Sequence, residues 1–106
     1  MKTLRDNKRK PTHPGAIIRE DILPGLDLTQ GDLAKHLGVS RMTVSEIIHE
    51  KRAVTAEMAL RISHVLGGSP EGWLRMQEAI DLWEAKQKMG KLSKTKPLSP
   101  HAQSYA

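Results

Sequence analysis

The chain of 106 residues has no cysteine and no phenylalanine, and only one tyrosine and two tryptophans. Without cysteine, disulfides, thiolate zinc sites and cysteine nucleophiles are excluded. With so few aromatic rings, we expect an aliphatic core. No segment approaches the roughly 18 apolar residues of a membrane span, and the basic N-terminus lacks the apolar stretch of a signal peptide. These absences predict a cytoplasmic protein, and the length of 106 residues predicts a single domain.

Basic residues are concentrated at the two ends of the chain, whose formal net charge is +5. Residues 1–10 contain five basic residues and one acid, and residues 86–106 contain five lysines and no acid. The segment between them is acidic overall. We therefore expect a flexible basic arm over residues 1–12, a helical domain over 13–89 and a disordered tail over 90–106. Such arms often grip phosphates, although a role in solubility is the simpler interpretation.

The spacing of the apolar residues predicts five helices and no strand. Pro14 suits the first turn of a helix that Pro24 and Gly25 end. The other four helices begin after hydroxyl-bearing caps, which are Thr29, Ser40, Thr55 and Ser69. The expected fold class is therefore all-α.

The segment from Gln30 to Ile48 reads QGDLAKHLGVSRMTVSEII and predicts a helix-turn-helix. Ala34 is small where the two helices cross, Gly38 permits the sharp turn, and Val39 fills the corner. Four apolar positions would lock the two helices together: Leu33, Leu37, Val44 and Ile47. The outer face of the second of these helices is then available to enter a DNA major groove.

The candidate DNA-binding residues are Gln30, Ser40, Arg41, Met42, Thr43, Ser45, Glu46, His49, Lys51 and Arg52. Arginine can bond guanine bidentately, serine and threonine can bond bases or phosphates, and methionine can pack on a thymine methyl. Glu46 can accept from a cytosine amino group but would repel a phosphate. Gln30, at a helix start, suits a phosphate contact, and Lys51 and Arg52 should lie near the flanking backbone. His49 suits contact with phosphate or with solvent.

A stripe of large apolar residues follows in the fifth predicted helix, with Trp73, Met76, Ile80 and Trp83 at spacings of three and four. The simpler interpretation is that this helix packs on the core. The alternative is that Trp73, Ile80 and Trp83 contribute to a dimer interface, since tryptophans are frequent interface anchors. A homodimer is expected mechanically, because two recognition helices read half-sites about 34 Å apart on one DNA face.

Other kinds of site have little support. The five histidines show no paired metal-ligand spacing, so we expect no metal and no other cofactor. There is no nucleophile elbow and no phosphate-binding glycine loop, and the carboxylates are scattered over predicted solvated faces. The sequence therefore predicts a protein that is not an enzyme.

Four segments together resemble the Xre-type (Cro/C1-type) helix-turn-helix family, and more closely its HigA-type antitoxins, the virulence-associated protein I branch. They are HPGAIIRED (13–21), the motif above, TAEMALRISHVLG (55–67) and SPEGWLRMQEAIDLW (69–83). The resemblance implies a five-helix, lambda-repressor-like fold, a homodimer, and repression of a toxin–antitoxin operon through its operator DNA. It also implies neutralisation of a HigB-type toxin that cleaves mRNA. Gly72 departs from relatives, which commonly carry an aromatic residue in this segment.

Two alternatives remain open at this point. The protein could be a stand-alone transcriptional regulator with no toxin partner. It could also be a protein-interaction module whose helix-turn-helix no longer binds DNA, which the acidic middle of the chain and Glu46 on the reading face favour. Arg41, the hydroxyl-bearing face and the Lys51-Arg52 pair argue against that second alternative.

Overall fold

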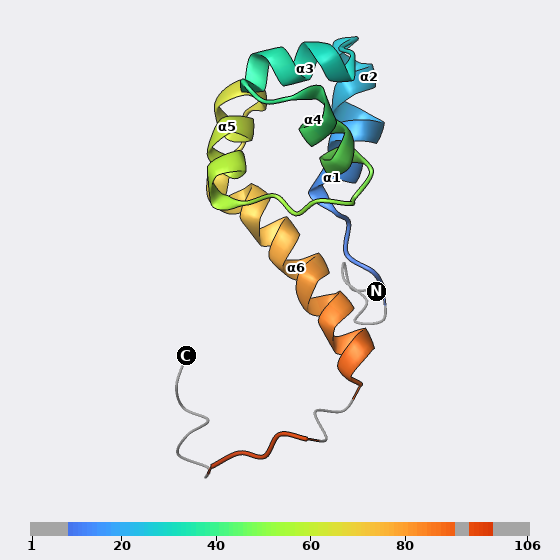
Figure 1. Cartoon of the computed structure of the whole chain (residues 1–106), viewed down its shortest axis with the longest axis vertical. Helices are drawn as coiled ribbons and strands as arrows, with labels where there is room; N and C mark the ends of the chain where they lie inside the picture. The colour runs from blue at the N-terminus through green and yellow to red at the C-terminus, as the bar shows by residue number, and fades with distance from the viewer. Residues whose placement is uncertain (1–8, 91–93, 99–106) are drawn as a thin grey trace, which may run out of the picture.

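The computed structural model describes residues 9–90 and 94–98. Within them, residues 14–89 form helices joined by short turns, and no strand occurs in the described ranges. The predicted all-α class is confirmed. The elements are α1 (Pro14–Ile17), η1 (Ile18–Ile22), α2 (Leu23–Leu26), α3 (Gln30–Leu37), α4 (Arg41–Ile48), α5 (Ala56–Leu66) and α6 (Pro70–Met89). The first six and the beginning of α6 form a globular unit, and the rest of α6 projects from it (Figure 1). Most of the predicted arm and tail lies outside the described residues. None of the helices in the described ranges is long and apolar enough to span a membrane.

The first three elements form one helical stretch that continues past its predicted end at Pro24 and Gly25. The turn before Pro24 is π-helical, and the Leu23 N–H donates to the Ile18 carbonyl five residues back. This wider turn keeps the chain helical through a residue that has no N–H, so the predicted stop was wrong. The helix instead ends at Asp27, whose φ is 54°. There the Leu28 N–H donates to the Leu23 carbonyl at 3.0 Å, which satisfies a terminal acceptor.

The helix-turn-helix has the caps that the sequence predicts. The Thr29 hydroxyl accepts from the Asp32 N–H at 3.0 Å, and the Asp32 carboxylate accepts from the Thr29 N–H at 3.2 Å. Gly38 ends α3 with φ +72°, and the Val39 N–H then donates to the Ala34 carbonyl at 3.1 Å. These local bonds set the sharp turn between α3 and α4.

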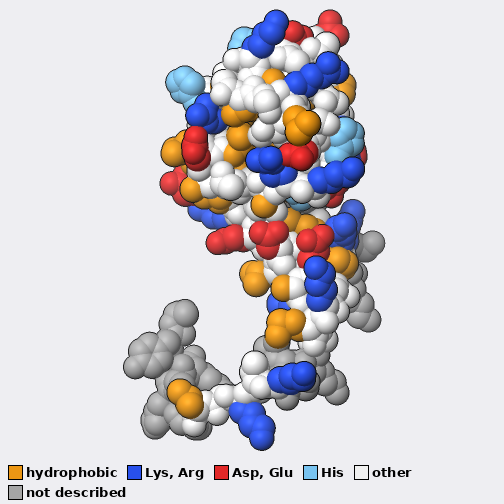
Figure 2. Space-filling view, in the orientation of Figure 1, with side chains coloured by type: hydrophobic (Ala, Val, Ile, Leu, Met, Phe, Trp, Pro, Cys, Tyr) orange, Lys and Arg blue, Asp and Glu red, His pale blue; other side chains and the backbone are white. Residues whose placement is uncertain are grey.

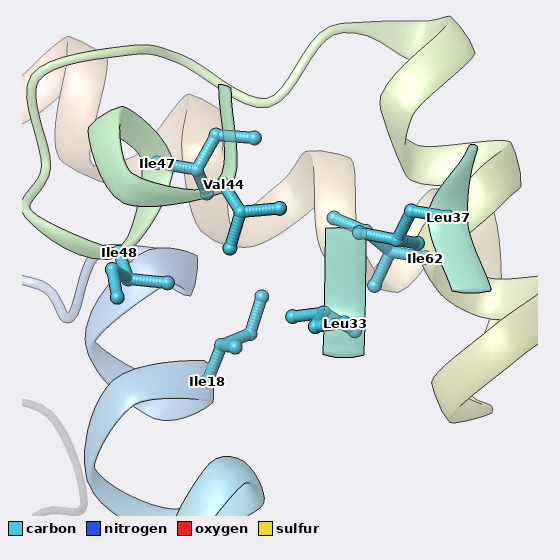
Figure 3. A pocket seen from close by; sticks show the side chains of 7 residues that line it. All are labelled: Ile18, Leu33, Leu37, Val44, Ile47, Ile48 and Ile62. Carbon is cyan, nitrogen blue, oxygen red and sulfur yellow. The ribbon is translucent and has the colours of Figure 1, made fainter. Parts of the chain in front are cut away.

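Four elements meet in an aliphatic core between the helices, shown in Figure 3. The side chains that converge there are Ile18 from η1, Leu33 and Leu37 from α3, Val44, Ile47 and Ile48 from α4, and Ile62 from α5. They leave a cavity of about 10 Å³, which is too small to hold a water comfortably. The predicted lock between the two motif helices is confirmed by the burial of its four residues, and η1 and α5 complete it.

Three polar side chains connect α5 and α6 to the rest of the molecule. The Arg61 guanidinium donates to the Leu37 carbonyl at the end of α3, at 2.8 Å. The buried Gln77 side chain accepts from the Val54 N–H at 2.8 Å and so binds the loop before α5 to α6. The Trp73 indole donates to the Gly67 carbonyl at 3.0 Å. Each bond satisfies a backbone group that no helix pairs.

Beyond Ile80, α6 leaves the globular unit (Figure 1). Its side chains there are largely exposed, including Leu82 and Met89. In Figure 2, acidic side chains gather across this helix close to the globular unit, and basic side chains follow further along it. The exposed acids here are Asp81 and Glu84, with Glu78 just before Ile80, and the exposed bases further along are Lys86 and Lys88.

Gly15 marks the closest approach between α1 and α4, and it yields a stability prediction. A Cβ built at Gly15 lies 1.9 Å from the Ile47 carbonyl oxygen, whereas a Cβ at Gly25 has nothing within 4 Å. We expect Gly15→Ala to lower the free energy of unfolding by about 3 kcal/mol, because backbone must move. Gly25→Ala, the matched control, should raise it by about 0.5–1 kcal/mol through helix propensity. Urea denaturation measures both, and equal effects would contradict this packing role for Gly15.

His13 yields a prediction of pH dependence. Its side chain is buried, and Nδ1 accepts from the Gly15 N–H at 2.9 Å, capping α1. Burial lowers the pKa of His13 below its ordinary value of 6.5, against the opposing pull of Glu50, Asp81 and Glu84. The unfolded chain therefore binds the proton more readily than the folded one. Stability should be fully present above about pH 6.5 and fall as the pH drops below it.

The measurement is Tm between pH 8 and pH 5 for the wild type and His13→Asn. Asparagine keeps a capping acceptor but does not titrate. The variant should lose less stability than the wild type over the acidic half of this range. Parallel Tm curves would show that another group carries the pH dependence.

Candidate nucleic-acid interface

α4 carries half of the predicted DNA-binding residues, and Ser40 and His49 cap its two ends. Its inner face is formed by Val44, Ile47 and Ile48, which are buried. The remaining side chains point away from the core by helical geometry, and Met42 is 70% exposed at the centre of that face. Arg41 is exposed beside it. The structure therefore presents α4 as a short helix with a solvent-facing surface that a major groove can admit.

Ser40 and Thr43 form a hydrogen-bonded pair at the start of α4. The Ser40 Oγ accepts from the Thr43 N–H at 3.1 Å, and the two hydroxyl oxygens lie 2.9 Å apart. Ser40 is thus the N-cap of the reading helix, as predicted, and its oxygen is engaged in capping. The Thr43 hydroxyl is the more available of the two for a base or a phosphate.

Glu46 and Arg52 are paired with each other. Arg52 Nη2 lies 2.7 Å from Glu46 Oε1, and Arg52 Nε donates to the same oxygen at 2.9 Å. The sequence suggested two separate contacts, a base for Glu46 and the flanking backbone for Arg52. The fold instead brings the two charges together across the turn that follows α4.

His49 closes the C-terminal end of α4. Its Nδ1 lies 2.7 Å from the Ser45 carbonyl oxygen, and because a carbonyl can only accept, Nδ1 carries the proton. The Ser45 hydroxyl is 3.4 Å from the same nitrogen. Ser45 and His49 therefore form a local unit at the edge of the outer face.

The chain turns sharply after His49 and carries Lys51 outward. Glu50 has φ 62°, and the Lys51 N–H donates to the Glu46 carbonyl at 2.8 Å. Arg19 from η1 donates to the Ile48 carbonyl and pairs with Glu50 at 3.4 Å. Among the described residues, neither Lys51 nor Arg41 has an ion-pair partner. These two cations are available to phosphates or bases.

Gln30 is the first residue of α3 and is half-buried. Its place at a helix N-terminus, where backbone N–H groups lack helical partners, is the one that the sequence predicts for a phosphate contact.

The three residues predicted for a dimer interface separate in the structure. Trp73 and Ile80 are 7% and 1% exposed and pack inside the protomer's own core, so their side chains are not available to a partner. Trp83 lies one turn beyond Ile80 and keeps an exposed edge, while its indole Nε1 is buried without a hydrogen-bond partner among the described residues. The simpler interpretation, packing of this helix on the core, holds for Trp73 and Ile80.

Sequence reasoning missed three residues that hold the interface in place: Arg19, Arg61 and Gln77. Gln77 had a readable signal, because it lies four residues after Trp73 and three before Ile80, on the buried face of α6. Arg19 and Arg61 had none, since each serves a carbonyl 24 or more residues away in the chain. Such partners follow from the fold alone.

A metal centre and a pocket are the other kinds of site that the described part of the chain could offer. No group of three or more potential metal ligands occurs there. A surface hollow of about 400 Å³ is lined by Leu37, Leu60, Arg61, His64 and Val65, where α3 meets α5. It lies apart from the outer face of α4.

Known proteins resemble this chain in both sequence and structure. A helix-turn-helix family model matches residues 18–73. Virulence-associated protein I of Dichelobacter nodosus is 41% identical over 96 residues, which cover 91% of this chain and 89% of that protein. Antitoxin HigA-1 of Vibrio cholerae is 35% identical over 96 residues, covering 90% of each. The solved structure of antitoxin GraA in complex with its operator matches with a TM-score of 0.78 and 38% identity, over 92% of this chain and 99% of that one. The chain therefore belongs to the helix-turn-helix family, within the group that includes virulence-associated protein I and the HigA antitoxins.

Proposed function

We propose that this protein is a DNA-binding antitoxin that represses its own toxin–antitoxin operon by binding operator DNA. The observation that carries the proposal is the solvent-facing surface of α4, with Met42 at its centre. Arg41 and Lys51 lie on this helix and the turn after it, and neither has an ion-pair partner among the described residues. GraA, a relative with the same fold, has been solved in complex with its operator. The action is binding rather than catalysis, and it takes place in the cytoplasm, at the nucleoid.

The second half of the proposed function is neutralisation of a partner toxin that cleaves mRNA. Its support is the resemblance to antitoxin HigA-1, which covers 90% of both chains. The test is co-purification of the tagged protein with the product of the adjacent gene, together with rescue of growth when that product is expressed. A neighbour that is neither toxic nor bound would favour a stand-alone regulator.

We further propose that the protein binds DNA as a two-fold homodimer. Two copies of α4 can then read half-sites about 34 Å apart, which one copy cannot do. The projecting end of α6 supplies exposed apolar side chains for such a contact, with Leu82 and Met89 60% and 55% exposed and Trp83 between them. A partner would cover the exposed edge of the Trp83 ring, and tryptophans are frequent interface anchors.

Gel-shift titration on the DNA upstream of the gene, at two salt concentrations and against excess scrambled duplex, tests the operator proposal. A tight shift that survives competitor is the expected result. A shift that competitor abolishes would contradict sequence-specific repression and favour an interaction module.

Two single substitutions should separate base reading from phosphate binding. Arg41→Ala should cost on the order of 1–3 kcal/mol on the operator and relax specificity at one base pair. Lys51→Ala should weaken operator and scrambled DNA alike and reduce the salt slope by about one unit. Equal losses on both DNAs for Arg41→Ala would show that Arg41 contacts only the backbone.

A further inference from the structure

The Glu46 side chain and backbone both hold the turn that follows the reading helix. Glu46 Oε1 accepts from Arg52 Nε at 2.9 Å and lies 2.7 Å from Arg52 Nη2. The Glu46 carbonyl accepts from the Lys51 N–H at 2.8 Å. No hydrogen bond of the described residues engages Oε2, so one carboxylate oxygen keeps its acceptor capacity.

Glu46 lies on the outer face of α4, opposite the buried side chains of that helix. It follows Met42 by four residues, so the two side chains stack on one helix face, and Met42 is 70% exposed. Val44, two residues before Glu46, points into the core and is 1% exposed. The Glu46–Arg52 pair therefore lies on the outer face, where a base edge or a phosphate would approach.

This pairing changes the charge that the face offers to DNA. An unpaired Glu46 would repel phosphates, and an unpaired Arg52 would attract them. Held together, the two charges cancel. Of the cations on α4 and the turn after it, Arg41 and Lys51 have no ion-pair partner among the described residues. The two side chains are 37% and 51% exposed, so an approaching DNA surface can reach the pair.

We propose that the Glu46–Arg52 pair determines how strongly the protein distinguishes its operator from other DNA. On the operator, Glu46 Oε2 accepts from the amino group of a cytosine while Arg52 stays on Oε1. On other sequences, no donor meets the carboxylate, and Glu46 keeps Arg52 away from the phosphates. The inference rests on the proposed operator binding and names the residues that set its specificity.

The test compares the wild type with Glu46→Ala on two probes, the duplex upstream of the gene and a scrambled duplex of equal length and composition. On scrambled DNA, the variant should bind about five- to tenfold more tightly near 0.1 M salt, with a salt slope steeper by about one unit per protomer, because Arg52 is released to a phosphate. The preference for the upstream duplex should fall about tenfold or more. Changing one C·G pair of that duplex to T·A should weaken the wild type and leave the variant unaffected.

Glu57→Ala is the matched control. Glu57 on α5 pairs with Arg61 at 3.0 Å, so its removal changes the net charge by the same amount and also deprives an arginine of its partner. Glu57 lies outside α4 and the turn after it. The Glu57→Ala variant should leave the salt slope and the preference between probes unchanged. This result would show that the effect of Glu46→Ala comes from losing the Glu46–Arg52 pair and not from the change in net charge.

Arg52→Gln completes a double-mutant cycle. In the wild-type background it should leave the salt slope on scrambled DNA unchanged, because Glu46 already withholds the arginine. In the Glu46→Ala background, Arg52→Gln should reverse the increase of about one unit in the salt slope that Glu46→Ala causes. If Arg52→Gln lowers the slope equally in both backgrounds, Arg52 is an independent phosphate contact and the inference is overturned.

The two proposals fail in different ways. A wild type that binds both probes equally contradicts the proposed operator, while the cycle on scrambled DNA still decides whether Glu46 withholds Arg52. A wild type that prefers the upstream duplex, together with a Glu46→Ala variant that keeps the whole preference, leaves the operator standing and removes the role of the pair.

Discussion

The burial of one side of α4 is the constraint on which the rest of the structure depends. α4 has eight residues, about two turns, and a helix of that length is not stable alone in water. It is held because Val44, Ile47 and Ile48 pack against η1, α3 and α5 around a nearly void-free core. Gly15 lets α1 approach the end of α4 closely, and Arg61 and Arg19 satisfy carbonyls at the ends of α3 and α4. The outer face of α4 is exposed to solvent because Val44, Ile47 and Ile48 on the inner face are buried against the other helices.

The charges on the outer face of α4 then determine how this face can bind DNA. A cation that already pairs with a carboxylate attracts DNA phosphates less than an unpaired one. The distribution of ion pairs therefore matters more for DNA binding than the net charge of +5. Arg19, Arg52 and Arg61 are each committed to a carboxylate, whereas Arg41 and Lys51 are not. The face therefore offers a small number of unpaired charges around an apolar centre at Met42. Such a surface favours binding that depends on sequence over binding that depends on charge alone.

Local chemistry explains which predictions were confirmed. Thr29, Gly38 and Ser40 act through hydrogen bonds or backbone angles within a few residues of themselves, and the structure shows each in its expected role. The end of the first helix was missed because a π-helical turn before Pro24 accommodates the proline. The sequence also placed Trp73 and Ile80 at a dimer interface, whereas the structure buries both in the chain's own core. An apolar stripe has the same spacing whether its own chain or a partner covers it, so the sequence could not tell the two apart.

The sequence by itself determined the helical class, the position of the helix-turn-helix and which residues face outward on α4, because each depends on periodicity and on caps that act at short range. Only the tertiary structure decided that Glu46 pairs with Arg52, that Arg61 caps α3 and that Gln77 holds Val54. These partners lie between 6 and 24 residues apart in the chain. Such distances are closed only when the helices pack, and no local pattern encodes which polar groups then come within hydrogen-bonding distance.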